Sequence, residues 1–210
     1  MKIILYGDSI TDMGRDRNFD FEHYAFGCGY SARVAGDLYY KDSTKYTVLN
    51  RGVSGNCSVD LYARLKEDVW NLKPDVLSIL IGINDLWHEI DNRNGVDVAR
   101  YEKVYRAIIE ETRERFPAVK FILMEPFVLK GSATEEKFDE FVKVGEYAAT
   151  VKKLAAEYGA YFLPLQDKMD EEAKRLGAGY VLYDGVHPSV AGAKIIADEW
   201  LGLFYEKVDK

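Results

Sequence analysis

The sequence predicts an α/β fold in which helices cover both faces of a parallel sheet. Five short runs of β character alternate with longer segments that have helical periodicity. The expected strands are at 2–6, 46–50, 75–81, 119–125 and 160–165. Such alternation is typical of parallel sheets, whose neighbouring strands are joined by crossover helices. No repeat or low-complexity linker divides the 210 residues, so we expect one domain over 1–210.

Apolar residues at helical spacing mark the segments between these strands. In 58–72 the recurring positions are Leu61, Leu65, Val69 and Leu72, which predicts one helix with a single buried face. Similar patterns predict helices over 97–116, 134–158 and about 189–206. The last of these follows Pro188, a residue suited to the first helical position.

Composition excludes several classes of protein. Hydrophobic residues make up 48% of the chain and charged residues 30%, as in soluble globular proteins. No apolar run approaches the roughly 18 residues of a membrane span, and the N-terminus lacks a signal-peptide pattern. The net charge of −7 argues against a nucleic-acid partner. Cys28 and Cys57 form neither a disulfide framework nor a zinc spacing, so we expect reduced thiols and a cytoplasmic protein.

Polar residues gather after the expected strands, where open parallel sheets place their sites. The segments are Gly7-Asp8-Ser9, Asn50 to Asn56, Gly82 to Asp85, and Asp184 to Pro188 before the last helix. Any one of them has an ordinary structural explanation, such as a turn or a helix cap. Gly-Asp-Ser alone favours a helix cap, and only its occurrence together with the other three segments favours a reactive serine.

Ser9 and His187 are the candidate nucleophile and base. A serine hydroxyl attacks only when a neighbouring base removes its proton, and histidine is the usual base near neutral pH. Of the three histidines only His187 has a carboxylate nearby in a turn, Asp184, which can orient its ring. The other two, His23 and His88, are expected at the surface or lining a pocket. The alternative for the segment is a capped helix preceded by a solvated turn.

An acyl-transfer site also needs donors for the developing oxyanion. The candidates are the Ser9 amide, the Gly52 amide, which no side chain shields, and the Asn84 side-chain amide. Ser54 is a rival nucleophile, but its surroundings, Gly52-Val53-Ser54-Gly55-Asn56, depart from the G-x-S-x-G elbow of α/β-hydrolases.

The four blocks, in this order, resemble those of the SGNH (GDSL-type) hydrolases. The family's Ser, Gly, Asn and His correspond to Ser9, Gly52, Asn84 and His187, with Asp184 completing the triad. The resemblance covers essentially the whole chain; Ile10 stands where many members have Leu. It implies a three-layer α/β/α sandwich with a five-stranded parallel sheet, flavodoxin-like, and Ser9 as nucleophile in a shallow cleft. It implies no metal and no cofactor.

A closer similarity concerns the substrate. The stretches "GDSITDMGRDR", "NRGVSGN", "KPDVLSILIGINDLW" and "DGVHPSVAGA" resemble the bacterial intracellular acetylxylan esterases. This implies an acetylated sugar as substrate, with Asp8 and Trp87 as candidate contacts. Aromatic faces on the first long loop could also stack on sugar rings. They belong to Phe19, Phe21, His23, Tyr24 and Phe26.

Other functions remain open from the sequence. The runner-up is a lysophospholipase or thioesterase of the same family. A non-catalytic carbohydrate-binding protein and an interaction module are the alternatives outside enzymes. The aromatic content, 13% of the chain, is compatible with self-association into a homo-oligomer.

Overall fold

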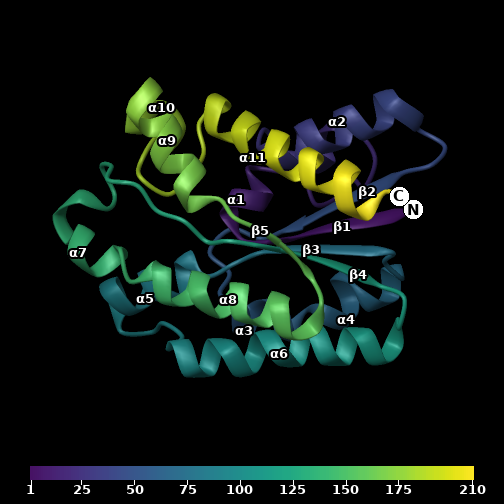
Figure 1. The fold of residues 1–210 in the computed structure, drawn as a ribbon, viewed down its shortest axis with the longest axis horizontal. Coiled ribbons are helices and arrows are strands. Elements are labelled where there is room, and N and C mark those ends of the chain that lie inside the picture. The colour runs from purple at the N-terminus through teal and green to yellow at the C-terminus, as the bar shows by residue number, and fades with distance from the viewer.

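The sheet has five parallel strands in the order β2-β1-β3-β4-β5 (Figure 1). The computed structural model describes residues 1–210. The strands are β1 (Lys2–Gly7), β2 (Thr47–Gly52), β3 (Val76–Leu80), β4 (Lys120–Met124) and β5 (Tyr161–Leu163). All five fall within a residue or two of the expected runs, except that β5 is shorter than predicted. The predicted fold class is confirmed, and the strand order is that of flavodoxin-like folds.

Helices cover both faces of the sheet (Figure 1). On one face lie α1 (Ser9–Asp12), α2 (Tyr30–Asp42), α9 (Gln166–Leu176), α10 (Ala178–Val181) and α11 (Val190–Leu203). On the other lie α3 (Ser58–Ala63), α4 (Leu65–Asp68), α5 (Ile83–Asn92), α6 (Val98–Arg115), α7 (Phe138–Phe141) and α8 (Val144–Tyr158). Short turns complete the chain: η1 (His23–Phe26), η2 (Trp70–Leu72), η3 (Glu135–Lys137) and η4 (Phe204–Val208). No helix is long and apolar enough to cross a membrane.

The central strands are buried on both sides, as parallel strands usually are. Every residue of β3 is buried, and 54 buried residues form one hydrophobic cluster. Trp200 of α11 lies fully in this core, where its Nε1 donates a hydrogen bond of 2.9 Å to Ser78 Oγ of β3. This contact anchors α11, and with it the segment that precedes the helix, on the sheet.

Two predicted helices are divided in the structure. The expected helix over 58–72 is divided into α3, α4 and η2, although it contains neither Gly nor Pro. The division follows Arg64, whose guanidinium donates to the carbonyls of Gly7 and Arg51 at the strand ends, a tertiary contact that periodicity does not report. The segment 134–158 is likewise divided into η3, α7 and α8. Helices α1, α2, α5, α9 and α10 are additional to those expected.

The start of α11 also corrects a prediction. Pro188 precedes the helix and pairs with Leu182 in an isolated bridge. Ser189 is the N-cap, and its Oγ accepts hydrogen bonds of 3.1 Å from the amides of Ala191 and Gly192. The hydroxyl satisfies two free amides of the first turn, a role that proline cannot fill.

Candidate active site

The carboxyl ends of β1, β2 and β3 meet at one edge of the sheet. Because β1 lies between β2 and β3, the chain leaves it in one direction to form β2 and returns on the other side to form β3. A crevice is expected at such a switch point. A cleft of about 400 Å³ is present there. Its lining residues are Ser9, Ser54, Gly55, Asn84, Trp87, His88, Asp91, Asn92 and His187.

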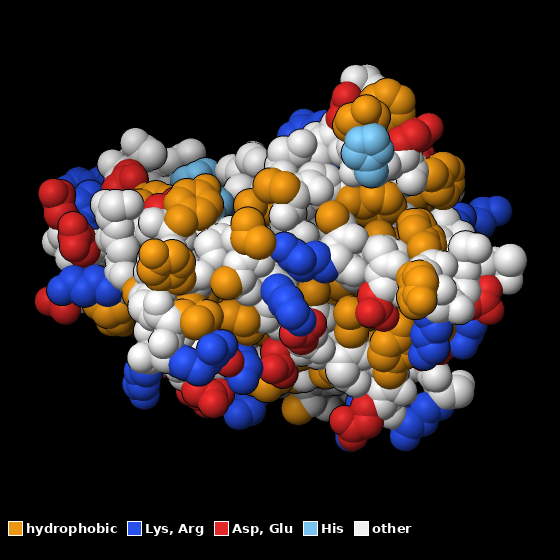
Figure 2. All heavy atoms as spheres, turned by 90° about the horizontal axis from the view of Figure 1, so that it is seen from above, with side chains coloured by type: hydrophobic (Ala, Val, Ile, Leu, Met, Phe, Trp, Pro, Cys, Tyr) orange, Lys and Arg blue, Asp and Glu red, His pale blue; other side chains and the backbone are white.

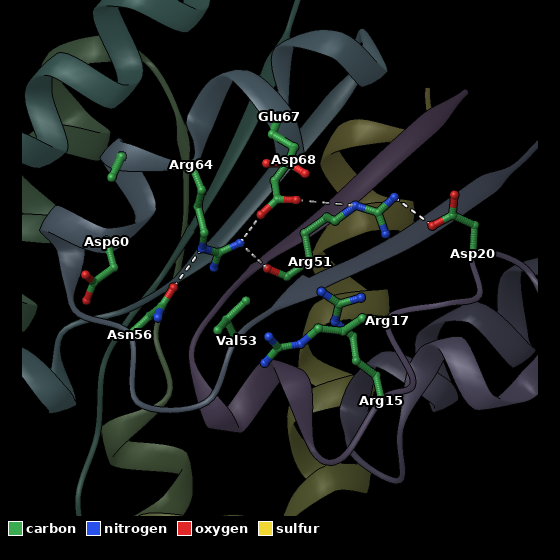
Figure 3. Close-up of a pocket in the computed structure, with 11 residues that line it drawn as sticks. Arg15, Arg17, Asp20, Arg51, Val53, Asn56, Asp60, Arg64, Glu67 and Asp68 are labelled. Carbon is green, nitrogen blue, oxygen red and sulfur yellow. Dashed lines mark hydrogen bonds and ion pairs between the residues drawn. The ribbon is translucent and has the colours of Figure 1, made fainter.

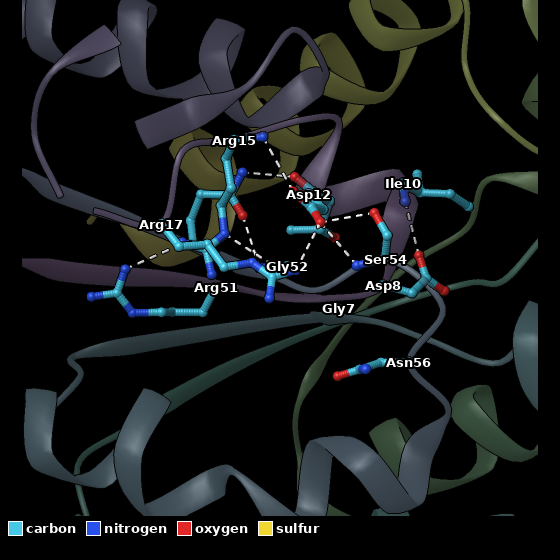
Figure 4. Close-up of polar contacts among 12 residues, drawn as sticks. Gly7, Asp8, Ile10, Asp12, Arg15, Arg17, Arg51, Gly52, Ser54 and Asn56 are labelled. Atoms are coloured by element: carbon cyan, nitrogen blue, oxygen red, sulfur yellow. Dashed lines mark hydrogen bonds and ion pairs between the residues drawn. The ribbon is translucent and has the colours of Figure 1, made fainter. Parts of the chain in front are cut away.

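Ser9 is the first residue of α1 and is separated from the end of β1 by one residue. Its Oγ lies 2.8 Å from Nε2 of His187, 178 positions away in sequence. The preceding Asp8 caps the same helix, since its Oδ1 accepts a hydrogen bond of 2.9 Å from the Ile10 amide (Figure 4). The two interpretations of Gly-Asp-Ser therefore coexist: Asp8 is the helix cap, and Ser9 presents its hydroxyl to an imidazole.

The turn before α11 orients His187 through Asp184. Asp184 Oδ2 lies 2.7 Å from His187 Nδ1. The other carboxylate oxygen accepts the backbone amides of Val186 and His187 at 2.9 and 2.8 Å. A carboxylate accepts only, so Nδ1 carries the proton and Nε2 presents its lone pair to the Ser9 hydroxyl.

Electrostatics in this pair favour the charged imidazole. The hydrogen bond to Asp184 raises the pKa of His187 above its ordinary value, outweighing the opposite effect of burial. Burial is the largest single influence on Asp184 and raises its pKa. The hydrogen bonds from the His187 ring and from two backbone amides outweigh it, so the pKa of Asp184 is lowered. Asp184 therefore stays ionised at neutral pH, beside a ring that it helps to charge.

Three residues that line the cleft have an unpaired N–H group. The backbone amides of Ser9 and Gly55 donate to no other group of the chain. The Asn84 side chain is 6% exposed, and its Nδ2 donates to the Asn56 carbonyl at 3.0 Å. A side-chain amide has two N–H groups, so one remains for a ligand. A hydroxyl, a base and several donors around one cleft can carry out acyl transfer.

The comparisons with known proteins agree with this chemistry. The family model of the GDSL-like Lipase/Acylhydrolase family matches residues 5–195. The chain belongs to this family. An acetylxylan esterase from Geobacillus stearothermophilus is 39% identical over 95% of this chain and 92% of that protein. The family and this relative identify the chain as a carboxylic ester hydrolase.

Two solved structures extend the likeness to the whole fold. A protein described as a GDSL-like lipase from Parabacteroides merdae superposes with a TM-score of 0.92 at 36% identity, covering 98% of this chain and 96% of the other. The acetylxylan esterase of Geobacillus stearothermophilus superposes with a TM-score of 0.84 at 38% identity, over 96% of this chain and 92% of the other. The predicted family resemblance is confirmed.

Gly52 does not serve this GDSL hydrolase as predicted. Its amide is buried and donates a hydrogen bond of 2.8 Å to Asn50 Oδ1, so it cannot also bind an oxyanion. Glycine is required there for another reason: a Cβ would lie 2.2 Å from the Asp12 amide nitrogen of α1. Gly52 lets α1 pack against the end of β2.

Gly55, three residues further on, is the glycine that reaches the cleft. Its φ of +83° belongs to the left-handed region that favours glycine, and space is open around its Cα. The loop turns there so that the residue borders the cleft with Ser9 and Asn84. Sequence reasoning missed it because the segment holds two glycines, and only the turn decides which amide faces the hydroxyl.

Asp8 is also not the substrate contact that the sequence suggested. It is fully buried and has no surface for a ligand. One oxygen caps α1, while Oδ2 has no hydrogen-bond partner. Burial raises the pKa of Asp8 to about 7, although the Ile10 amide and His187 act in the opposite direction. Asp8 holds the strand–helix junction that presents Ser9.

The aromatic residues divide between the cleft and other places. Trp87 borders the cleft, with Nε1 donating to Asp91 Oδ2 at 2.9 Å and the ring edge-on to Phe141. Tyr183, which sequence reasoning missed, stacks on the His187 ring at 5.8 Å between centroids. The five side chains expected on the first loop do not line the cleft. Phe26 is buried in the interior, whereas the other four are exposed, with Phe19 and His23 in contact with the Tyr24 ring at 5.7 and 3.7 Å between centroids.

The remaining polar candidates have structural partners. Ser54, the rival nucleophile, donates its Oγ to Asp12 Oδ2 at 2.8 Å and is not bonded to a histidine (Figure 4). His88 borders the cleft, and its Nδ1 lies 3.4 Å from the Sγ of buried Cys57. Burial and nearby carboxylates raise the pKa of the Cys57 thiol, which makes it a poor nucleophile.

We expect Gly52→Ala to destabilise the fold. The added methyl group would meet backbone atoms of α1, which cannot move aside as a flexible side chain can, so we expect a loss of about 3 kcal/mol in the free energy of unfolding. Urea denaturation measures it. Gly36→Ala on α2 is the matched control, because its Cβ would enter open space. A Gly52→Ala protein as stable as the wild type but with lower kcat would contradict this role.

Proposed function

We propose that the protein is a serine esterase that removes acetyl and other short acyl groups from carbohydrates, with xylo-oligosaccharides as the main substrates. The observation that carries the proposal is the continuous line of contacts from Ser9 Oγ to His187 at 2.8 Å and from His187 to Asp184 at 2.7 Å. The Geobacillus relative supports it: solved structures of that acetylxylan esterase include variants described as catalytic mutants, in which a serine, an aspartate or a histidine is replaced by alanine.

Acylation begins when the hydroxyl of Ser9 attacks the ester carbonyl. His187 Nε2 takes the hydroxyl proton as the new C–O bond forms, and the resulting imidazolium is stabilised by Asp184. The tetrahedral intermediate then collapses with loss of the sugar alkoxide, which receives the proton from His187. The acyl group remains on Ser9 as an ester.

Deacylation repeats the sequence with water as the nucleophile. His187, neutral again, takes a proton from water, which attacks the acyl carbon. The second tetrahedral intermediate releases Ser9, whose oxygen recovers the proton from His187. Acetate leaves, and the cleft returns to its starting state.

Three donors stabilise the negative charge that forms on the carbonyl oxygen in both steps. They are the amides of Ser9 and Gly55 and the free N–H of Asn84 Nδ2. Hydrogen bonds of this kind strengthen as charge develops, and loss of one commonly costs about 3–4 kcal/mol of transition-state stabilisation. Gly55 replaces Gly52 in the donor set that the sequence suggested.

The lining of the cleft favours a short acyl group on a polar alcohol. Among its residues Trp87 is the only large apolar side chain; the others are mainly polar. A long acyl chain would stay largely exposed to water, because the cleft has no apolar wall against which to bury it. A sugar ring, by contrast, can stack on aromatic faces such as Trp87 and Tyr183 and bond to polar groups around them.

A substrate panel tests the proposal. We expect kcat/KM for acetylated xylo-oligosaccharides to exceed that for a lysophospholipid or a long-chain acyl ester by at least about tenfold, measured as acid released at constant pH. A preference for long chains would favour the lysophospholipase or thioesterase alternative. Binding of xylo-oligosaccharides with no release of acetate from any ester would favour a non-catalytic carbohydrate-binding protein.

A further inference from the structure

A second hollow adjoins the catalytic cleft, because residues of the loop that follows β2 line both. Figure 3 shows the residues that line this hollow. It has a volume of about 680 Å³, within the range of small-molecule sites. Its charged lining comes from three places in the chain: the loop after α1, the end of β2, and the α3–α4 region. The charged residues are Arg15, Arg17, Asp20, Arg51, Asp60, Arg64, Glu67 and Asp68.

Two of the four arginines are neutralised by neighbours. Arg51 pairs with Asp20 at 2.7 Å and lies 3.9 Å from Asp68. Arg64 pairs with Asp68 and donates to Asn56 Oδ1 at 2.7 Å (Figure 3). These contacts form a fixed wall of the hollow, and their positive charge is already matched.

Arg15 is different. It is half-buried, and its Nε donates to the Gly52 carbonyl at 2.9 Å, but it takes part in no ion pair and its two terminal nitrogens donate to no group of the chain. Burial lowers the pKa of Arg15 to about 10, with nearby Arg51 contributing in the same direction. Asp12 and Asp68 act in the opposite direction but form no ion pair with it. A half-buried cation without a direct ion pair is costly, because burial removes water that would otherwise solvate it.

Arg17 adds a second cation to the same side, with most of its N–H donors unpaired. Its only charged contact is with Asp12, at 3.5 Å from one terminal nitrogen, and its side chain is 56% exposed. In Figure 3 the side chains of Arg15 and Arg17 lie together on the side of the hollow facing Arg64. Two guanidinium groups with free N–H donors match an oxyanion, which accepts several charge-assisted hydrogen bonds at once.

The hollow and the cleft share one stretch of chain. Val53 and Asn56 line the hollow, while Ser54 and Gly55 between them line the cleft. Asp12 joins the two sides, because its Oδ2 holds the amide and hydroxyl of Ser54 at 2.9 and 2.8 Å and also faces Arg17. A ligand that spans more than one sugar unit can therefore have its ester near Ser9 and another group in the hollow.

We infer that Arg15 and Arg17 form a subsite for an anionic group, a carboxylate or a phosphate ester, on the alcohol part of the substrate. The inference rests on the proposed function, which supplies the ester and its sugar. The net charge of the chain is −7, so a preference for an anionic substrate would run against the overall field and has to come from local cations.

The experiment compares kcat/KM for three acetylated substrates: a neutral xylo-oligosaccharide, the same oligosaccharide bearing a uronic acid, and a sugar phosphate. We expect kcat/KM for one of the charged substrates to exceed that for the neutral one by about tenfold, a modest effect for charge-assisted hydrogen bonds. The preferred substrate identifies the group. In Arg15→Gln the ratio of charged to neutral kcat/KM should fall to about one, and in Arg17→Gln it should fall part of the way.

Matched variants separate a local subsite from a general charge effect. Arg175→Gln removes the same charge from an exposed position on α9, where it pairs with Glu172, and should leave the ratio unchanged. Arg17→Gln keeps the test decisive if Arg15→Gln does not fold, since the exposed Arg17 side chain makes a single contact. Equal kcat/KM for charged and neutral substrates, or equal ratios in all variants, overturns the subsite. Failure to hydrolyse the neutral acetyl ester overturns the proposed function instead.

Discussion

Replacing Ser9 by alanine is expected to lower kcat/KM for an acetyl ester by about four orders of magnitude or more. The substitution removes the only hydroxyl bonded to His187 Nε2, so no acyl-enzyme can form. The remaining rate would come from the oxyanion donors acting on water. Acetate release at several enzyme concentrations measures it, and circular dichroism checks that the fold is unchanged.

Ser54→Ala is the matched control for this prediction. Ser54 also borders the cleft, but its hydroxyl is bonded to Asp12 rather than to a histidine. We expect a loss of less than about tenfold, because only a loop anchor is removed. Retained activity in Ser9→Ala together with its loss in Ser54→Ala would identify Ser54 as the nucleophile and disprove the assignment.

Asp184→Asn is expected to lower kcat by about 10⁴-fold. The amide can donate to Nδ1, which favours the ring tautomer with its proton on Nε2, where it cannot accept a proton from Ser9. The same change removes the carboxylate that stabilises the imidazolium during attack. Steady-state kinetics on the acetyl ester measures the loss.

The pH profile of kcat/KM gives this variant a second readout. In the wild type Asp184 raises the pKa of His187, and activity needs the neutral ring, so the rate should fall as pH drops through that raised pKa. In Asp184→Asn the pKa of His187 is lower, so the acidic limb should move to lower pH. An unchanged acidic limb would mean that another group controls the profile.

Much of the fold could be read from the sequence because its signals are local. Each buried strand is a short apolar run, and a run such as 119–125 is recognised without its neighbours. The positions at which helices end or divide were harder to predict. The helix over 58–72 is divided at Arg64, whose side chain donates to carbonyls near the ends of β1 and β2. The expectation of one domain stays a prediction.

The expectation of a homo-oligomer also stays a prediction. The face of the molecule that carries α11 has hydrophobic side chains interspersed with charged ones (Figure 2).

The contact of Ser9 with His187 was predictable for a chemical reason. The chain has three histidines, and only His187 follows a carboxylate, Asp184, within a turn-like segment, so the pairing with Ser9 was predicted from residue types and strand ends. The oxyanion donors were not equally predictable. Every residue has a backbone amide, and whether it is free depends on its hydrogen bonds, as the contrast between Gly52 and Gly55 illustrates.

The amino-acid sequence by itself determined the fold class and the family, and it predicted that Ser9, His187 and Asp184 act together. These are matters of residue type and order, which the chain carries before it folds. Only the tertiary structure decided which glycine lines the cleft, that Asp8 is buried beside Ser9, and that Arg15 forms no ion pair. Burial and pairing are relations between distant segments, so they exist only once the strands and helices have packed together.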